Sequence, residues 1–448
     1  MMRVRFNLKN VPGRVPNASG VCCEFKASGP AVSRQRKIES RRVKRKKIPW
    51  PVFLFLPTLV VPWIIFIGPL RMSLYRIVLL AMVLPCLAMW ISGKAGRLRI
   101  ADIALLLFSF WCTLSFIVIN GIALSVQPIG IGFIETIGAY LLARCYIRDA
   151  DDFYNIVQLL FWIVVFLLPF AIFECVTGEN ISRDLFATTL PTISTFMPPR
   201  MGLTRVQSVF DHPILFGLST GSILALVHLV LGYRKTFFQR ALRTGIVGAT
   251  SILSLSSGAV VAIVAQGCLL SWHGLLRPIK NRWTILIGLL VLILLAIEMG
   301  ANRSALDIVM SYLVFDSGSY WFRKIIWDYG WASALTHPVF GVGLNQWERP
   351  EGMPSSIDNF WLAIAVGHGL PAAFLILLAF FLIFLTISFR KGLDKKLIEY
   401  RTGFLISMLG LFLATWTVAL WDAAYVLFLF LLGSGVWMLD VDTKKRGP

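Results

Sequence analysis

The chain has 448 residues, of which 57% are hydrophobic and only 15% are charged, whereas an average soluble protein is nearer 25% charged. With a mean hydropathy of +0.74, 33 Phe and 15 Trp, this composition excludes a soluble globular enzyme and a disordered chain. It also excludes an outer-membrane barrel, because barrel strands alternate in polarity instead of running apolar for about 20 residues. The sequence predicts an all-α polytopic membrane protein.

Positive charge is concentrated at the start of the chain. Residues 1–49 hold 14 of the 43 basic residues and 2 of the 23 acidic ones. Such an excess can indicate nucleic-acid binding, but in a membrane protein a tail held near anionic lipid is the simpler interpretation. We therefore expect residues 1–49 to form a basic, disordered cytoplasmic tail without a nucleic-acid partner. A membrane domain over 50–440 and a second cytoplasmic tail over 441–448 follow.

About twelve membrane spans are predicted. Apolar runs of spanning length occur in chain order at 50–69, 72–92, 101–122, 129–147, 154–175, 209–233, 283–300, 359–388, 402–420 and 421–440. The stretch 242–274 is long enough for two short helices, broken at Ser254-Leu255-Ser256-Ser257-Gly258. With the N-terminus inside, the inner loops and both tails carry 34 of the 43 basic residues, as the positive-inside rule requires.

Two long loops, about 176–208 and 301–358, are expected on the outer face. The second contains an aromatic-rich segment that places Arg323, Trp327 and Gly330 near one helical face. Such a segment is expected to lie at the membrane interface. Two long loops on one side of a bundle suggest a site at the membrane surface that a lipid-borne substrate can reach.

The first long loop ends in a group of polar residues. Arg200 and Arg205 lie five positions apart, and Asp211 and His212 follow directly before Pro213. Because a guanidinium is permanently charged and can bind a phosphate through two hydrogen bonds, Arg205 is a candidate ligand of a lipid pyrophosphate. The alternative is that the arginines contact lipid headgroups, which we favour for Arg200. His212 either caps the following helix or contacts the substrate.

The second long loop offers three further candidates. His337 begins a turn in which Gly341 and Gly343 permit close approach of the backbone to a ligand. Asp358 and Asn359 stand at the start of the tenth span, where both residue types are favoured as helix caps. Capping and a chemical role are equally well supported for this pair.

Acidic residues within predicted spans are costly and point to a partner or a function. Glu135 is deep in its span and is expected to form a structural ion pair with Arg76. Glu174 lies near an outer span end, and its carboxylate is expected to reach water.

Taken together, these motifs resemble the superfamily of O-antigen ligases and Wzy-type polymerases of bacterial surface polysaccharides. The residues that carry the resemblance are Arg205, Phe210-Asp211-His212-Pro213 with Gly217, Ser256-Ser257-Gly258, Arg323-x3-Trp327, the His337-Pro-x2-Gly-x-Gly343 turn, and Asp358-Asn359-x2-Leu362 with Gly367-x-Gly369. Their order and placement in the two loops make the set more specific than any one motif.

The resemblance implies transfer of a glycan from an undecaprenyl-pyrophosphate donor in the bacterial inner membrane, with inversion and without a metal or other cofactor. Arg205 and Arg323 would bind the leaving pyrophosphate. The chain departs from the family in three places. The break after Leu255 is Ser-Ser-Gly instead of a sequence containing Arg, the late second loop lacks the histidine that ligases carry, and eleven residues instead of the family's ten separate Arg205 from Gly217. The second departure disfavours a ligase.

The leading hypothesis is therefore a polysaccharide repeat-unit polymerase with cytoplasmic termini. Its candidate catalytic residues are Asp358, His337 and Asp211, in that order, and its candidate substrate-binding residues are Arg205, Arg323, His212, Asn359 and Trp327. The expected partners are the lipid-linked oligosaccharide, membrane lipids, a chain-length regulator and a flippase. The alternatives are an O-antigen ligase on the same fold and a transporter that flips lipid-linked glycans, for which interrupted helices would line a path through the membrane.

Overall fold

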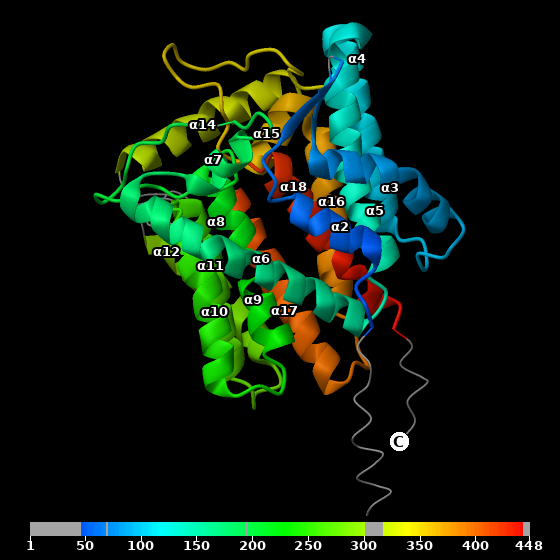
Figure 1. Cartoon of the computed structure of the whole chain (residues 1–448), viewed down its shortest axis with the longest axis vertical. Coiled ribbons are helices and arrows are strands. Elements are labelled where there is room, and N and C mark those ends of the chain that lie inside the picture. Colours follow the sequence, from blue (N-terminus) through cyan, green and yellow to red (C-terminus); the bar gives the residue numbers. More distant parts are fainter. Residues whose placement is uncertain (1–45, 69, 194, 301–316, 442–448) are drawn as a thin grey trace, which may run out of the picture. The chain divides into compact units, whose positions relative to one another are not determined.

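Helices dominate the part of the chain that the computed structural model describes, which comprises residues 46–68, 70–193, 195–300 and 317–441 (Figure 1). Most of the predicted N-terminal tail, all but one residue of the C-terminal tail and the start of the second long loop lie outside these residues. In the described ranges nine helices are long and apolar enough to cross a membrane. The chain is a multi-pass membrane protein, although these nine helices do not establish the twelve spans expected.

In chain order, the elements are α2 (Trp50–Thr58), β1 (Ile64–Ile67), β2 (Leu70–Ser73), α3 (Leu74–Ile91), α4 (Ile100–Phe133), the π-helix η1 (Ile134–Gly138), α5 (Ala139–Tyr146), α6 (Ala150–Thr177), α7 (Ile181–Ala187), α8 (Pro213–Gly221), α9 (Leu224–Leu226), the π-helix η2 (Val227–Leu231), α10 (Phe237–Ile252), α11 (Ser257–Leu275), α12 (Arg282–Gly300), α14 (Ser317–Thr336), α15 (Phe360–His368), α16 (Leu370–Ser388), α17 (Lys395–Thr415), α18 (Asp422–Ser434) and the 3₁₀ helix η3 (Val436–Leu439).

The first expected span, 50–69, is wrong as a continuous helix. Its apolar run forms the nine-residue α2 and then the antiparallel hairpin β1–β2, in which Phe66 pairs with Arg71. Pro57 lies in the last turn of α2 and Pro62 follows four residues after its end. Because proline cannot donate a helical hydrogen bond and disfavours a helical conformation in the residue before it, these two positions stop the helix.

One expected helix break is confirmed, and a second interruption lies inside a predicted span instead of between two. The stretch 242–274 is divided into α10 and α11, separated by residues 253–256. The predicted spans 101–122 and 129–147 lie in one run of helix that is interrupted at Gly121, where φ is +76° and ψ is 165°. Only glycine adopts such a backbone readily, so the interruption falls at this position.

Close helix packing in the centre of the bundle depends on small residues. A Cβ atom at Gly217 of α8 would lie 2.3 Å from the Ser254 hydroxyl, and one at Gly410 of α17 would lie 2.7 Å from Gln266 of α11. The Gln266 side chain is fully buried, and its Nε2 donates to the Gly221 carbonyl at 3.0 Å. Small residues let helix backbones approach closely in membranes, so α8, α11 and α17 form a tight block.

The first long loop, residues 178–212, and α14 lie at the same end of the bundle (Figure 1). The turn that precedes α10 lies at the opposite end. Helix α14 runs across the bundle rather than along it and packs against α15. Its aromatic residues Trp321, Tyr329 and Trp331 are exposed, which matches the expected position of this helix at a membrane interface, where such side chains are enriched.

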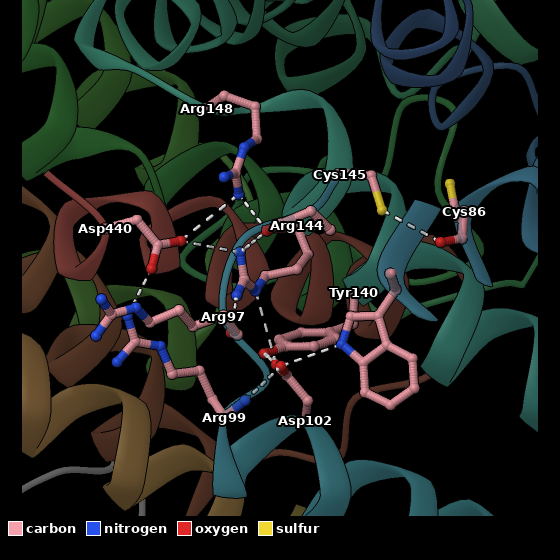
Figure 2. Close-up of polar contacts among 11 residues, drawn as sticks. Cys86, Arg97, Arg99, Asp102, Tyr140, Arg144, Cys145, Arg148 and Asp440 are labelled. Carbon is pink, nitrogen blue, oxygen red and sulfur yellow. Dashed lines mark hydrogen bonds and ion pairs between the residues drawn. The ribbon is translucent and has the colours of Figure 1, made fainter. Parts of the chain in front are cut away.

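A buried ion cluster joins the start of α4, the end of α5 and the residue after η3 (Figure 2). Asp440 accepts a hydrogen bond from Arg99 at 2.6 Å and lies 3.4 Å from Arg144 and 3.6 Å from Arg148. Arg144, which is 1% exposed, also lies 3.7 Å from Asp102. One carboxylate therefore faces three guanidinium groups and holds the chain after η3 against the α3–α4 loop.

Candidate functional site

The buried carboxylate of Glu174, near the end of α6, holds the first long loop in place. Glu174 is 2% exposed and accepts the backbone N–H groups of Gln207 at 3.0 Å and of Ser208 at 2.9 Å. Asn180 donates to the Ser208 carbonyl at 2.7 Å. The expectation that Glu174 reaches water is wrong, because backbone donors replace water around the charge. The loop segment that leads to Asp211 is thereby held in one conformation.

Arg205 is a buried cation with few protein contacts. Arg205 is only 7% exposed. Among the described residues its guanidinium makes one long hydrogen bond, from Nη1 to the Met197 sulfur at 3.9 Å. Nε is buried and has no hydrogen-bond partner among the described residues. Burial and, secondarily, the charge of Arg200 lower the pKa of Arg205 to about 10. A desolvated guanidinium with unused donors is suited to binding an anion.

The break between α10 and α11 receives contacts from both long loops. From the first loop, Arg200 Nη1 donates to the Leu255 carbonyl at 3.1 Å, and the backbone N–H of Val206 donates to the Leu253 carbonyl at 3.2 Å. From the second loop, Arg323 Nη2 donates to the Ser257 hydroxyl at 2.8 Å. The residues that bind Arg200 and Arg323, Leu255 and Ser257, are therefore two positions apart in sequence.

The second loop brings an acid and two tryptophans close to Arg323. Burial raises the pKa of Asp358, while the nearby Arg323 charge opposes this rise. One turn along α14, Trp327 stacks on Trp331 with ring centroids 6.2 Å apart and an angle of 3°, and it also contacts Trp416 at 6.1 Å. An indole surface of this kind can pack against a sugar ring or a lipid chain.

Two predicted site residues act as helix caps. The Nδ1 atom of His212 accepts the backbone N–H of Ile214 at 3.1 Å at the start of α8. Asn359, which is 3% exposed, accepts the backbone N–H of Leu362 at 3.0 Å at the start of α15. Burial, followed by the charges of Arg205 and Arg200, lowers the pKa of His212 to about 4. The imidazole is therefore neutral at pH 7 and can still donate through Nε2.

His337 lies apart from Arg323. It follows the last residue of α14, 14 positions after Arg323, which corresponds to about 21 Å along a helix axis. Its side chain is exposed. The glycine turn that begins at His337 packs against the backbone of α15. The N–H of Val342 donates to the Val366 carbonyl at 2.8 Å, and that of Gly343 donates to the Gly367 carbonyl at 3.0 Å. The turn thus fastens α14 to the junction between α15 and α16.

Replacing Gly369 with Ala should test this fastening. Gly369 has a φ of +85°, and an added Cβ would lie 2.0 Å from the Val339 carbonyl oxygen. We expect Gly369→Ala to lower the free energy of unfolding by at least about 2 kcal/mol, because backbone strain and the clash add. Gly352, with a φ of +79° and open space around it, should lose only about 1 kcal/mol as Ala. Equal shifts in the detergent unfolding midpoint of both variants would contradict the close approach.

Residues near the start of α18 belong to this region although no sequence motif indicated them. The ring of Trp421 contacts that of His212 edge to face at 5.8 Å. Asp422 forms an ion pair with Arg76 at 2.5 Å. The predicted pair of Arg76 and Glu135 is confirmed at 2.8 Å, so Arg76 links two carboxylates. Asp422 and Arg76 are 346 positions apart, and no periodicity or spacing could have related them.

The chemical character of the site is that of a cation-lined surface next to several carboxylates. Arg200, Arg205 and Arg323 supply guanidinium groups, and His212 supplies a neutral donor. Among the residues that the structure describes, no group of three or more His, Cys, Asp or Glu side chains is arranged to hold a metal ion. The arrangement can bind a multiply charged anion and offers nearby carboxylates as proton acceptors.

Comparison with known families identifies one part of the chain. Residues 218–377 match the family model described as O-antigen ligase. This segment runs from α8 into α16 and contains the α10–α11 break, Arg323, the glycine turn and Asp358, whereas Arg205 and His212 precede it. A comparison with curated proteins gives no match. Residues 218–377, about a third of the chain, are thus similar to the O-antigen ligase family.

Proposed function

We propose that the protein is a polysaccharide repeat-unit polymerase that uses an undecaprenyl-pyrophosphate-linked glycan as donor. The observation that carries this proposal is the meeting of both arginine-bearing loops at the α10–α11 break. Arg200 is bonded to Leu255 at 3.1 Å and Arg323 to Ser257 at 2.8 Å, with the buried Arg205 beside Arg200. The matched family segment contains this break.

In the proposed reaction a sugar hydroxyl of one lipid-linked unit attacks the anomeric carbon of another chain. The bond from that carbon to the pyrophosphate oxygen breaks, and negative charge grows on the leaving group. Guanidinium groups at Arg205 and Arg323 would stabilise this charge more strongly as the bond breaks, which lowers the barrier. A donor that enters from the bilayer would meet these groups at the level of α14.

The location that goes with this function is the outer face of the bacterial inner membrane, with the basic loops and both termini in the cytoplasm. The lipid-linked oligosaccharide and the surrounding lipids would be the direct partners. A flippase that delivers the donor and a chain-length regulator are expected to act with the enzyme. The exposed aromatic residues of α14 support an interfacial position for the site.

An O-antigen ligase on the same fold is the second candidate, and the family match is equally compatible with it. The second loop carries Ser356, Ile357, Asp358 and Asn359 where ligases have their late histidine, which favours the polymerase. A flippase is less well supported, because the arginines contact a helix break beside the two loops instead of lining interrupted helices along a path through the bundle.

The two enzyme activities can be separated with purified protein in liposomes. With an undecaprenyl-pyrophosphate oligosaccharide as the only substrate, a polymerase should produce products that are multiples of the repeat unit. A ligase should consume the donor only after a separate lipid A-core acceptor is added. Donor that crosses to the other leaflet without any change in mass would support the transporter and contradict both enzymes.

A further inference from the structure

A pair of carboxylates lies where the end of the first long loop meets the start of α18. Asp211 and Asp422 line one small cavity of about 40 Å³, together with Arg71 and Tyr75. The two carboxyl groups are close enough for each to affect the protonation of the other. A cavity of this volume accommodates a water molecule or a single hydroxyl group.

Asp422 combines an unusual backbone conformation with an ion pair. It is the first residue of α18 and has a φ of +48°, which is rare for a residue with a side chain. Arg76 Nη2 lies 2.5 Å from Asp422 Oδ1, and Arg76 Nε lies 2.8 Å from Glu135. The Asp422 side chain remains 29% exposed. The Asp422 carboxylate is therefore oriented by Arg76 and is still accessible from the cavity.

Charges of both signs face the pair. Asp211 is near the guanidinium groups of Arg71 and Arg183, and Asp422 is near Arg76, with Glu135 and Tyr75 behind it. Burial, the charge of Asp422 and the hydrogen bond that a protonated Asp211 donates to Asp422 raise the pKa of Asp211 to about 6, against the opposing charges of Arg71 and Arg183. Asp211 is accordingly a stronger base than an ordinary aspartate, whose pKa is about 3.9.

The pair also adjoins the cation-lined surface. Asp211 immediately precedes His212, whose imidazole lies within electrostatic range of Arg205 and Arg200 and contacts Trp421. Residues 211–212 and 421–422 thus face each other: Asp211 is close to Asp422, and the His212 ring contacts the Trp421 ring. A hydroxyl group in the cavity would therefore contact Asp211, whose neighbour His212 is within electrostatic range of Arg205.

We propose that Asp211 accepts the proton of the acceptor sugar hydroxyl and that Asp422 is the positioning residue that makes Asp211 basic enough to do so. This inference rests on the proposed glycan transfer. As the hydroxyl oxygen bonds to the anomeric carbon, its proton passes to an Asp211 oxygen and the electron pair of the breaking bond leaves with the pyrophosphate. Asp211 then releases the proton to water in the cavity.

The test is the pH dependence of transfer by the full chain in liposomes between pH 4.5 and 8. A base works only when deprotonated, so wild-type turnover should fall as the pH drops through about 6. Asp422→Asn removes the neighbouring charge, and the acidic limb should move down by as much as about two pH units. Asp422→Glu keeps the charge and should keep the limb near its wild-type position.

Asp211→Asn should lower turnover by about 10²- to 10⁴-fold while binding of the lipid-pyrophosphate donor, measured separately, is retained. Asp184→Asn is the control, because Asp184 is an exposed carboxylate on the same loop and should leave the profile unchanged. An acidic limb that stays in place in Asp422→Asn, or that moves instead in Asp358→Asn, overturns the inference. If Asp422→Asn does not reach the membrane, Asp211→Asn still decides, since retained turnover would exclude Asp211. A wild-type protein without transfer would refute the proposed function itself.

Discussion

Arg205→Lys and Arg323→Lys are each expected to reduce glycan transfer by about a hundredfold or more. Lysine keeps the charge but replaces a planar fork of donors with a point charge, so a two-point contact to a phosphate is lost. A contact that strengthens as the leaving group departs contributes about 2.7–4 kcal/mol when oxyanion-type contacts are taken as a guide. For Arg205 the loss should be pronounced, because its buried Nε has no protein partner in the described residues.

Arg349→Lys is a matched control for this pair. Arg349 is in the second long loop, where its Nε donates to the Met353 carbonyl at 2.9 Å and its guanidinium lies over the Trp347 ring. Arg200 cannot serve as a control, since it is bonded to the α10–α11 break. Product length and amount should be measured at equal membrane abundance. Near-normal polymer from both Arg205→Lys and Arg323→Lys would show that these arginines do not bind the pyrophosphate and that the loops have a structural role.

Asp440→Asn should destabilise the protein by about 3 kcal/mol. Asp440 is the carboxylate that faces Arg99, Arg144 and Arg148 in the buried cluster (Figure 2). Its removal leaves three guanidinium groups close together, with Asp102 as the remaining acid beside Arg144. Removing one partner of a buried pair typically costs about 3–5 kcal/mol, and the 15% exposure of the Asp440 side chain places the expectation at the lower end.

The control for this prediction is Asp151→Asn. Asp151 pairs with Lys396 at 3.4 Å, but the two side chains are 56% and 36% exposed, and an exposed pair contributes at most about 1 kcal/mol. The free energy of unfolding in detergent, measured with a denaturant, should separate the two variants clearly. Similar values for both would show that the cluster is hydrated and that Asp440 is not essential to it.

Sequence alone was sufficient where a local signal decides the structure. The break between α10 and α11 at residues 253–256 was predictable because short polar residues there interrupt an otherwise apolar helix. Glu135 and Arg76 could be paired because each is a lone charge in an apolar span, where a charge needs a partner. The continuous helix over 50–69 was wrong because hydropathy was weighed above Pro57 and Pro62, whose effect on the backbone is also local.

The rest of the site depends on contacts that sequence spacing does not encode. Asp422 resembles an ordinary helix start, and its pairing with Asp211 requires the first loop and the last helix to meet. Arg200 and Arg205 are indistinguishable as residue types, yet one reaches the Leu255 carbonyl and the other is buried with its donors largely unused. Which of two nearby arginines is engaged is decided by the path of the loop.

The shared attachment of both long loops to the α10–α11 break makes them mechanically dependent on each other. A rotation of α11 relative to α10 displaces the Leu255 carbonyl and the Ser257 hydroxyl together, so Arg200 and Arg323 cannot shift separately while both bonds persist. Leu255, with a φ of +44°, is at the pivot of such a rotation. Ligand binding that stabilises one loop position must therefore favour the matching position of the other, with the same coupling free energy in both directions. In the proposed polymerase, this coupling would make binding of the growing chain and binding of the incoming unit depend on each other.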